Sequence, residues 1–170
     1  MITIVESGLK FGPFHPNQIF QIEISANVRS RQGIKTCEFV WWKNRSTQLV
    51  LVEAKRSIPH PTNNPEAYNN FWQDVLEKFD NAMQLMLLAT LRRPPQLHHE
   101  LPAEMQALPW EQLKLVCYLV IPDAPNDVLQ ALTDRLRNEM KRQKRLWRQS
   151  ELFVINANKA RDASLTMAPH

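Results

Sequence analysis

The chain has 170 residues, of which 44% are hydrophobic, and its 21 Lys and Arg against 17 Asp and Glu give a net charge of +4. This length and composition favour one globular domain with its own core over two smaller domains. Cys37 and Cys117 both lie in apolar, strand-like runs, which argues against a disulfide framework. Because the sequence shows neither a secretory leader pattern nor a long uncharged apolar run, we expect no membrane association and a cytoplasmic location.

The first predicted element is a short strand near the amino terminus, followed by a turn rich in Gly and Pro. The next segment, residues 17–30, fits two patterns. Alternation of apolar residues at Phe20 and Ile22 is typical of a strand, whereas the spacing of Ile19, Ile22 and Glu23 fits one face of a helix. We favour the helix, on which Glu23 would share the inward-facing side.

The clearest strands cover residues 34–42 and 48–57, which are rich in β-branched, aromatic and aliphatic side chains. The short polar segment 44–47 between them predicts a hairpin. If all of 44–47 forms the loop, Lys43 pairs with Gln48. Both faces of the two strands are apolar except at one end, a pattern typical of central strands that are covered on both sides.

The rest of the chain continues this pattern of alternating strands and helices. Asn64 and Pro65 predict the start of a long amphipathic helix that Pro94 ends. The adjacent side chains of residues 98–100 do not easily converge on one metal ion, so we interpret His98-His99-Glu100 as a solvated loop. The remaining predicted elements are an interior strand over 113–121, an amphipathic helix over 129–147 and a short strand over 151–156.

These elements predict an α/β fold with a single domain, in which helices flank a mixed central β-sheet. The domain is expected to cover residues 1–158, and residues 159–170 to form a flexible C-terminal tail.

Basic residues cluster between Arg135 and Arg148, where seven Lys and Arg face a single acid, Glu139. Such a local excess of positive charge favours binding of a polyanion such as nucleic acid. A solvated outer face of a helix is the alternative interpretation. Within the cluster, the candidate phosphate contacts are Lys141, Arg142 and Arg145.

Three ionisable side chains are expected to converge at one end of the predicted hairpin. Glu53 and Lys55 are two residues apart on a strand, so both project from the same face. The hairpin register brings Glu38 opposite Glu53 on that face. Two opposed carboxylates beside apolar neighbours repel each other and are costly to desolvate, so they require a compensating cation. Lys55 supplies one positive charge, and Mg²⁺ or Mn²⁺ would supply more.

This set of side chains suits the hydrolysis of a phosphodiester. A metal ion held by Glu38 and Glu53 would activate the attacking water, while Lys55 would stabilise charge that develops on the phosphate oxygens. Glu23 would add a metal ligand or position a water molecule. The alternative is a structural salt bridge between Lys55 and one glutamate at the rim of the sheet.

The order of these elements resembles the PD-(D/E)xK, or restriction-endonuclease-like, nuclease superfamily. The resemblance covers residues 17–121, with an acid on the first hairpin strand, Glu-x-Lys on the second and a long helix after it. It implies a restriction-endonuclease-like core in which Glu38 and Glu53 bind metal, Lys55 is catalytic and Glu23 assists, and it is compatible with a homodimer. A Cys-Glu pair replaces the commoner Pro-Asp, and the helix lacks the Gln-x-x-x-Tyr pattern of the RecB-like branch.

The sequence thus predicts a Mg²⁺-dependent nuclease that acts on DNA, with RNA as the second substrate class. The leading alternative is a subunit that keeps the nuclease-like fold and binds nucleic acid without cleaving it. A third class, a structural or protein-interaction domain, predicts neither divalent-ion binding nor salt-sensitive affinity for nucleic acid.

Overall fold

A five-stranded mixed β-sheet forms the centre of the computed structural model, which describes residues 1–148 and 150–167. In chain order, the first three strands of this sheet pair antiparallel with their neighbours, and the last three run parallel to one another. The sheet confirms the predicted single α/β domain with a mixed central sheet. In spatial order its strands are β3 (Ile19–Phe20), β4 (Phe39–Lys43), β5 (Gln48–Ala54), β6 (Lys114–Val120) and β7 (Ser150–Ile155).

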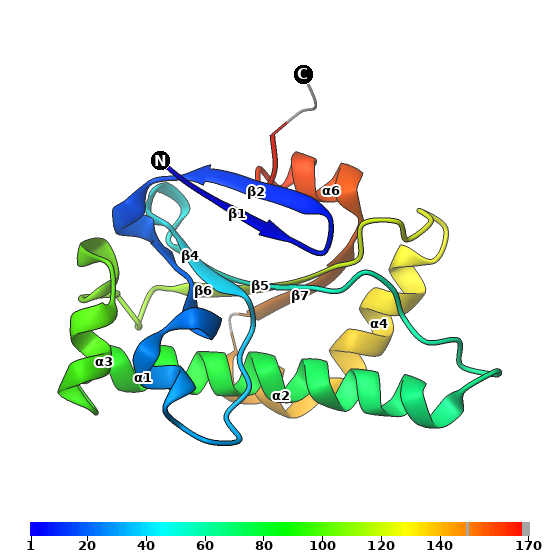
Figure 1. Ribbon diagram of the computed structural model, residues 1–170, viewed down its shortest axis with the longest axis horizontal. Helices are drawn as coiled ribbons and strands as arrows, with labels where there is room; N and C mark the ends of the chain where they lie inside the picture. Colours follow the sequence, from blue (N-terminus) through cyan, green and yellow to red (C-terminus); the bar gives the residue numbers. More distant parts are fainter. Residues whose placement is uncertain (149, 168–170) are drawn as a thin grey trace.

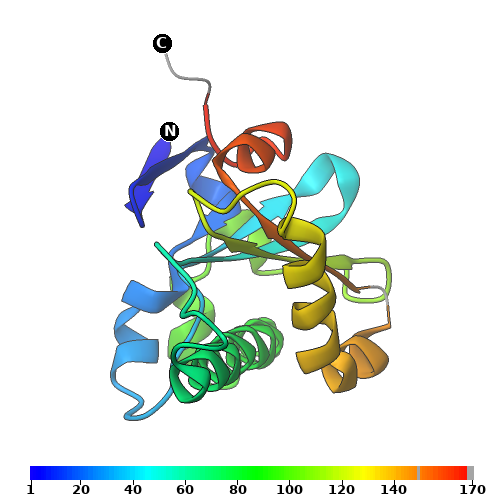
Figure 2. The same cartoon turned by 90° about the vertical axis from the view of Figure 1, so that its right-hand side faces the viewer.

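Helices and a separate hairpin cover the two faces of this sheet. Helices α2 (Pro65–Thr90) and α4 (Leu129–Glu139) lie on one face (Figures 1 and 2). The hairpin of β1 (Ile2–Glu6) and β2 (Leu9–Phe14), together with α6 (Ala157–Asp162), lies on the other. Each layer buries its own apolar core against the sheet.

Strand β5 lies in the middle of the sheet and is buried on both faces. Leu49 and Leu51 belong to the core beneath α2, and Val50 and Val52 to the core beneath the β1–β2 hairpin. This burial confirms the predicted central strand. The same alternation places the next residue of the series, Glu53, on the α2 side of the sheet.

The predicted hairpin register is confirmed along the whole of β4, from Phe39 opposite Val52 down to the loop. The loop itself contains the 3-10 helix η3 (Asn44–Ser46). Beyond Phe39 the pairing becomes irregular, because the Glu38 N–H donates to the carbonyl of Val52 at 3.0 Å. The expected pairing of Glu38 with Glu53 is therefore not part of the ladder.

Helix α2 begins where the sequence predicted. The Asn64 side chain accepts a hydrogen bond from the Ala67 N–H at 3.0 Å, and Pro65 occupies the first turn. The helix ends at Thr90, before Pro94. Among the described residues, no helix combines the length and apolar character needed to cross a membrane.

The segment 17–30 is not the single helix that we favoured from its spacing. It contains strand β3, the 3-10 helix η2 (Ile22–Ile24) and the short helix α1 (Ala26–Arg29). Pairing of β3 with β4 at the edge of the sheet overrides the helical periodicity. The cap of the short helix is Ser25, whose hydroxyl accepts from the Val28 N–H at 3.2 Å.

The predicted solvated loop at 98–100 is wrong, because these residues end a helix that packs on α2. His98 is buried, and its Nδ1 lies 2.9 Å from the carbonyl oxygen of Ala89. Glu100 accepts a hydrogen bond from the Ser25 hydroxyl, which ties this helix to α1. The remaining short elements are η1 (Pro16–Gln18), α3 (Pro95–Glu100), η4 (Ala103–Met105) and α5 (Lys141–Trp147).

The predicted flexible tail is also wrong over residues 159–167. The second half of helix α6 lies in this segment, and the Ala160 and Leu165 side chains are fully buried. The bridge between Phe11 and Thr166 joins the segment to β2. Burial of small and apolar side chains beneath the hairpin thus orders a segment that was predicted to be a flexible tail. Residues 168–170 of the predicted tail lie outside the described part of the chain.

Candidate functional site

Glu53 lies at the carboxyl end of β5, where its side chain has no exposed surface. Lys55 follows directly after the strand, and its backbone N–H still donates to the carbonyl of Val120 at 2.9 Å. Because the chain remains extended there, both side chains project toward α2. The Nζ of Lys55 lies 3.1 Å from Oε1 of Glu53.

A second lysine, Lys78 of α2, contacts Glu53 from the helix. Its Nζ donates to Oε1 of Glu53 at 2.8 Å and lies 3.8 Å from Oε1 of Glu23. The Nζ of Lys55 also lies 3.2 Å from Oδ2 of Asp74. Asp74 and Lys78 are one helical turn apart, so α2 presents an anion and a cation to the same end of β5.

The electrostatics of this network reflect its burial. Burial raises the pKa of Glu53, and the neighbouring charges of Lys78 and Lys55 oppose that rise. Burial disfavours the ammonium of Lys78, but Glu53, together with the charges of Glu38 and Glu23, more than offsets this effect and raises the pKa of Lys78. The second oxygen of Glu53, Oε2, is buried and has no hydrogen-bond partner among the described residues. A buried carboxylate oxygen without such a partner is costly to desolvate.

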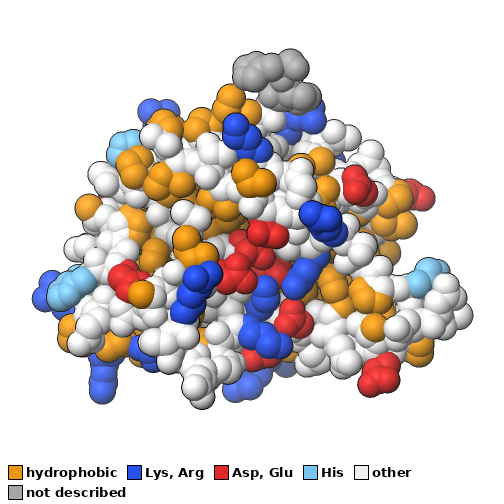
Figure 3. Space-filling model, viewed as in Figure 1, with side chains coloured by type: hydrophobic (Ala, Val, Ile, Leu, Met, Phe, Trp, Pro, Cys, Tyr) orange, Lys and Arg blue, Asp and Glu red, His pale blue; other side chains and the backbone are white. Residues whose placement is uncertain are grey.

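Glu38 and Glu23 complete the cluster. Burial, a hydrogen bond between the two carboxyl groups and repulsion from Glu53 raise the pKa of Glu38 to about 9. Glu38 therefore carries a proton at neutral pH when no metal is bound. The structure brings together Glu23, Glu38, Glu53 and Lys55. The 3-10 helix η2 positions Glu23, and the irregular strand end before β4 positions Glu38. Figure 3 shows acidic and basic side chains gathered at the centre of the molecular surface that faces the viewer in Figure 1.

The acids supply hard oxygen ligands of the kind that Mg²⁺ and Mn²⁺ accept. No group of three or more His, Cys, Asp or Glu side chains in residues 1–148 and 150–167 is arranged to hold a metal ion. Two carboxylates would therefore hold such an ion. Glu53 would offer its unpartnered Oε2, and Glu38 would offer its oxygens once it loses its proton. Mg²⁺ commonly keeps several water ligands, which suits a site with few protein oxygens.

Lys78 and Asp74 are members of the site that sequence reasoning missed. The inward face of their helix was predicted from its apolar residues alone. A signal was present, because Lys78 falls within the buried stripe that contains Val75 and Ala82. A lysine in such a stripe requires a buried partner, and the acids of the neighbouring hairpin were the available candidates.

The basic residues of α5 do not lie beside the acidic cluster. The predicted helix over 129–147 breaks at Met140 (φ −92°, ψ 19°), and α5 contacts α4 and β7. There Arg142 lines a pocket with Asp80 and Gln84. Figure 2 shows α1 and α5 on opposite sides of α2. A nucleic acid that contacts both regions would have to pass around this helix.

Comparisons with protein-family models, curated proteins and solved structures found no match to this chain. Its function is therefore inferred from the chemistry and geometry of the cluster.

Proposed function

We propose that this protein is a Mg²⁺-dependent nuclease that hydrolyses phosphodiester bonds in DNA, with RNA as the second substrate class. The observation that carries the proposal is the buried carboxylate of Glu53, which two lysines contact at one oxygen while the other oxygen has no partner among the described residues. Such burial is costly, and a cation at the second oxygen would offset part of that cost.

Membership of the PD-(D/E)xK superfamily is part of the same proposal. An acid before the first hairpin strand, Glu-x-Lys at the end of the second and a long helix after it occur in the order of that superfamily. The convergence of Glu38, Glu53 and Lys55 at one end of β5 supports the assignment. Mn²⁺ is the natural experimental substitute for Mg²⁺ because both accept carboxylate and water oxygens.

Each side chain has a distinct role in the proposed mechanism. A Mg²⁺ ion bound by Glu38 and Glu53 would supply an activated water and polarise the phosphate. The Lys55 side chain is 29% exposed, so its ammonium can reach a phosphate oxygen and stabilise the charge that develops there. Asp74 holds that ammonium in position at 3.2 Å. The Lys78 side chain is only 11% exposed, so it positions Glu53 and does not contact the substrate.

A non-cleaving nucleic-acid-binding subunit is the second candidate, and one observation favours it. Lys78 already neutralises Glu53, and Glu38 shares a hydrogen bond with Glu23, so protons and lysines can stabilise the cluster without metal. On this interpretation Glu23 is a structural partner. In the nuclease proposal, Glu23 instead becomes free to bind the metal or to position a water when Glu38 loses its proton.

Cleavage assays with single- and double-stranded DNA and RNA would test the proposal. Each substrate is incubated with wild type and Glu53→Gln in Mg²⁺, in Mn²⁺ and in EDTA. Cutting that requires the divalent ion and disappears in the variant would support the nuclease. Binding without cutting in every ion would favour the second candidate. Light scattering on the same samples would test the homodimer with which the resemblance is compatible.

A further inference from the structure

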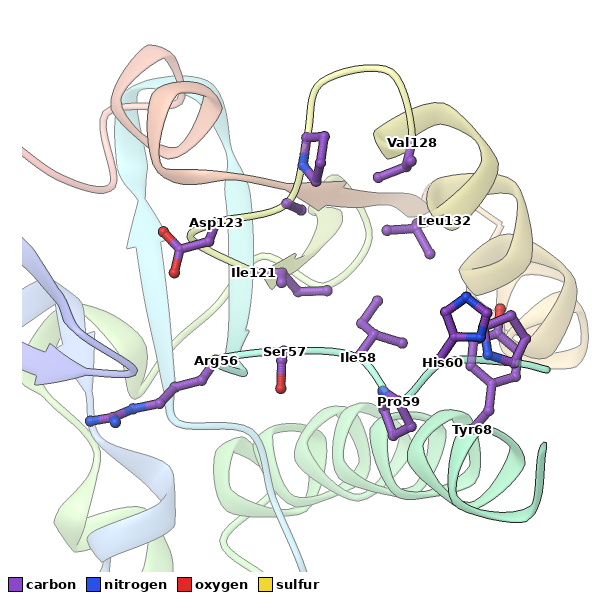
Figure 4. Close-up of a pocket in the computed structure, with 13 residues that line it drawn as sticks. Arg56, Ser57, Ile58, Pro59, His60, Tyr68, Ile121, Asp123, Val128 and Leu132 are labelled. Carbon is purple, nitrogen blue, oxygen red and sulfur yellow. The ribbon is translucent and has the colours of Figure 1, made fainter. Parts of the chain in front are cut away.

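A pocket of about 460 Å³ lies at the carboxyl ends of β5 and β6, directly after Lys55 in the chain. One wall is the segment 56–61 and the other is drawn from residues 121–132 (Figure 4). Its volume falls in the range of about 300–1,000 Å³ that is usual for small-molecule sites. In α/β sheets this edge is the common place for ligands, because the loops that leave neighbouring strands separate there.

The walls of the pocket are mainly apolar and include an aromatic ring. Ile58 and Ile121 face each other near its centre, and Tyr68 of α2 lies at one end (Figure 4). The Tyr68 ring packs edge to face on Trp72 at 6.0 Å, and the guanidinium carbon of Arg135 lies 5.7 Å from its centroid. These contacts hold the ring in place. A fixed aromatic ring among aliphatic side chains is a surface on which a nucleobase stacks.

Charge is placed at the other end of the pocket. Arg56 extends away from the end that Tyr68 and His60 form (Figure 4). The preceding residue, Lys55, lies 3.1 Å from Glu53, so the pocket begins one residue beyond the acidic cluster in the chain. Asp123 lies on the opposite wall, also on the side away from Tyr68 (Figure 4), and offers an acceptor for an amino or hydroxyl group. A nucleotide has the matching polarity, with an anionic phosphate at one end and a flat base at the other.

We infer that this pocket binds the nucleoside next to the phosphodiester that is cleaved, with its base on the Tyr68 side and its phosphate near Arg56 and Lys55. The inference rests on the proposed nuclease function, since it takes Lys55 as the neighbour of the reacting phosphate. It adds a specific occupant, which is one base of the bound strand. The base is held by stacking and apolar contact, so its identity is read weakly.

The test fills the pocket and asks whether one nucleotide loses its contribution to binding. Val128 lines the pocket and is 38% exposed, so Val128→Trp would occupy the space with a larger side chain. Leu88 is equally exposed at 38% but lies outside the pocket, which makes Leu88→Trp the matched control. Affinity is measured in EDTA for a short single-stranded DNA and for versions in which each base in turn is removed.

For wild type and Leu88→Trp, removal of one particular base should weaken binding by about fivefold or more, the scale of one stacked base. Val128→Trp should bind the intact DNA with the weaker affinity that wild type shows for the DNA lacking this base. Removal of the same base should not lower the affinity of Val128→Trp further. The inference would be overturned by any of three results: an equal loss of affinity at every base position, the same position dependence in Val128→Trp as in wild type, or no DNA binding. Binding that depends on one base position, without cleavage in Mg²⁺, would support the pocket and reject the nuclease. Cleavage in Mg²⁺ by a protein whose binding depends on no single base would support the nuclease and reject the pocket.

Discussion

The ammonium of Lys78 lies 2.8 Å from Oε1 of Glu53, and the Glu53 side chain is fully buried. The pair joins the middle of α2 to the end of the central strand. Both charges have lost most of their hydration, so each depends on the other for compensation. The pair therefore belongs both to the stability of the fold and to the proposed chemistry.

Lys78→Met should destabilise the protein strongly. Removal of one partner from a buried ion pair leaves an uncompensated charge and costs about 3–5 kcal/mol of unfolding free energy, and the remaining contact with Lys55 places our expectation at the lower end. Lys35→Met is the control, since Lys35 contacts Asp74 at 2.9 Å but is largely exposed, and it should change stability little. Urea unfolding measures both. Equal losses in the two variants would mean that the pair with Glu53 has no special weight.

The central sheet could be predicted because local and long-range signals agree there. The apolar runs of β5 and β6 are typical of strands that are covered on both faces. Asn64 caps the following helix by a local hydrogen bond, and Pro65 fits its first turn. The position of Glu38 could not be predicted in the same way. It depends on an irregular strand end that forms beside Val52, and nothing in the local spacing signals that irregularity.

Other errors have the same cause, which is that tertiary contacts decide weak local preferences. The short strand β3 forms because β4 offers it an edge, and α6 orders because Leu165 finds a buried place beneath the hairpin. The role of Lys78 was missed for a different reason. Its position on the inward face was readable from the sequence, but its partner Glu53 lies 25 residues away in the chain.

Mg²⁺ or Mn²⁺ should raise the melting temperature, because an ion that binds only the folded carboxylate cluster stabilises the native state by mass action. Glu53→Gln should abolish the rise, since it removes the charge of the carboxylate that carries the unpartnered oxygen. Glu104→Gln, a change at an acid outside the cluster, should keep the rise. Thermal scans with and without each ion provide the measurement. A full rise in Glu53→Gln would place the ion elsewhere on the protein.

The stability of the metal-free protein should fall as the pH rises through the neutral range. The pKa of Glu38 is raised from 4.5 to about 9, so between these values the folded state binds a proton that the unfolded state has lost. Unfolding free energy then decreases with increasing pH. Glu23, Glu53 and Lys78 face this carboxyl group and are unchanged in Glu38→Gln, which should show a flatter profile. Urea unfolding in EDTA at several pH values would measure the difference. Parallel profiles would contradict the assigned shift.

The basic face of α5 should contribute phosphate contacts. Replacement of Lys141, Arg142 and Arg145 together by Gln is expected to weaken nucleic-acid binding and to reduce its salt dependence by about one unit of slope for each lost contact. The control removes the same charge on the far side of the sheet, with Gln in place of Lys10, Lys159 and Arg161. Binding is measured across a salt series. An unchanged slope would identify α5 as a solvated face.

Lys55→Met should separate catalysis from metal binding. The variant keeps every carboxylate, so the divalent ion should still bind, and more tightly because a competing positive charge 3.1 Å from Glu53 has gone. The charge that develops on the phosphate loses its partner, so cleavage should fall by about a hundredfold or more.

Two comparisons make that result specific to the role of Lys55. Substrate affinity should change little, because a contact made mainly in the transition state lowers kcat and kcat/KM together. Lys35→Met removes the other lysine that contacts Asp74 without touching Glu53, and it should keep cleavage near the wild-type rate. Calorimetry with Mn²⁺ and cleavage kinetics in Mg²⁺ on the same preparations give both readouts. If Lys55→Met cuts as fast as wild type, the ammonium beside Glu53 is a structural ion pair and the catalytic assignment fails.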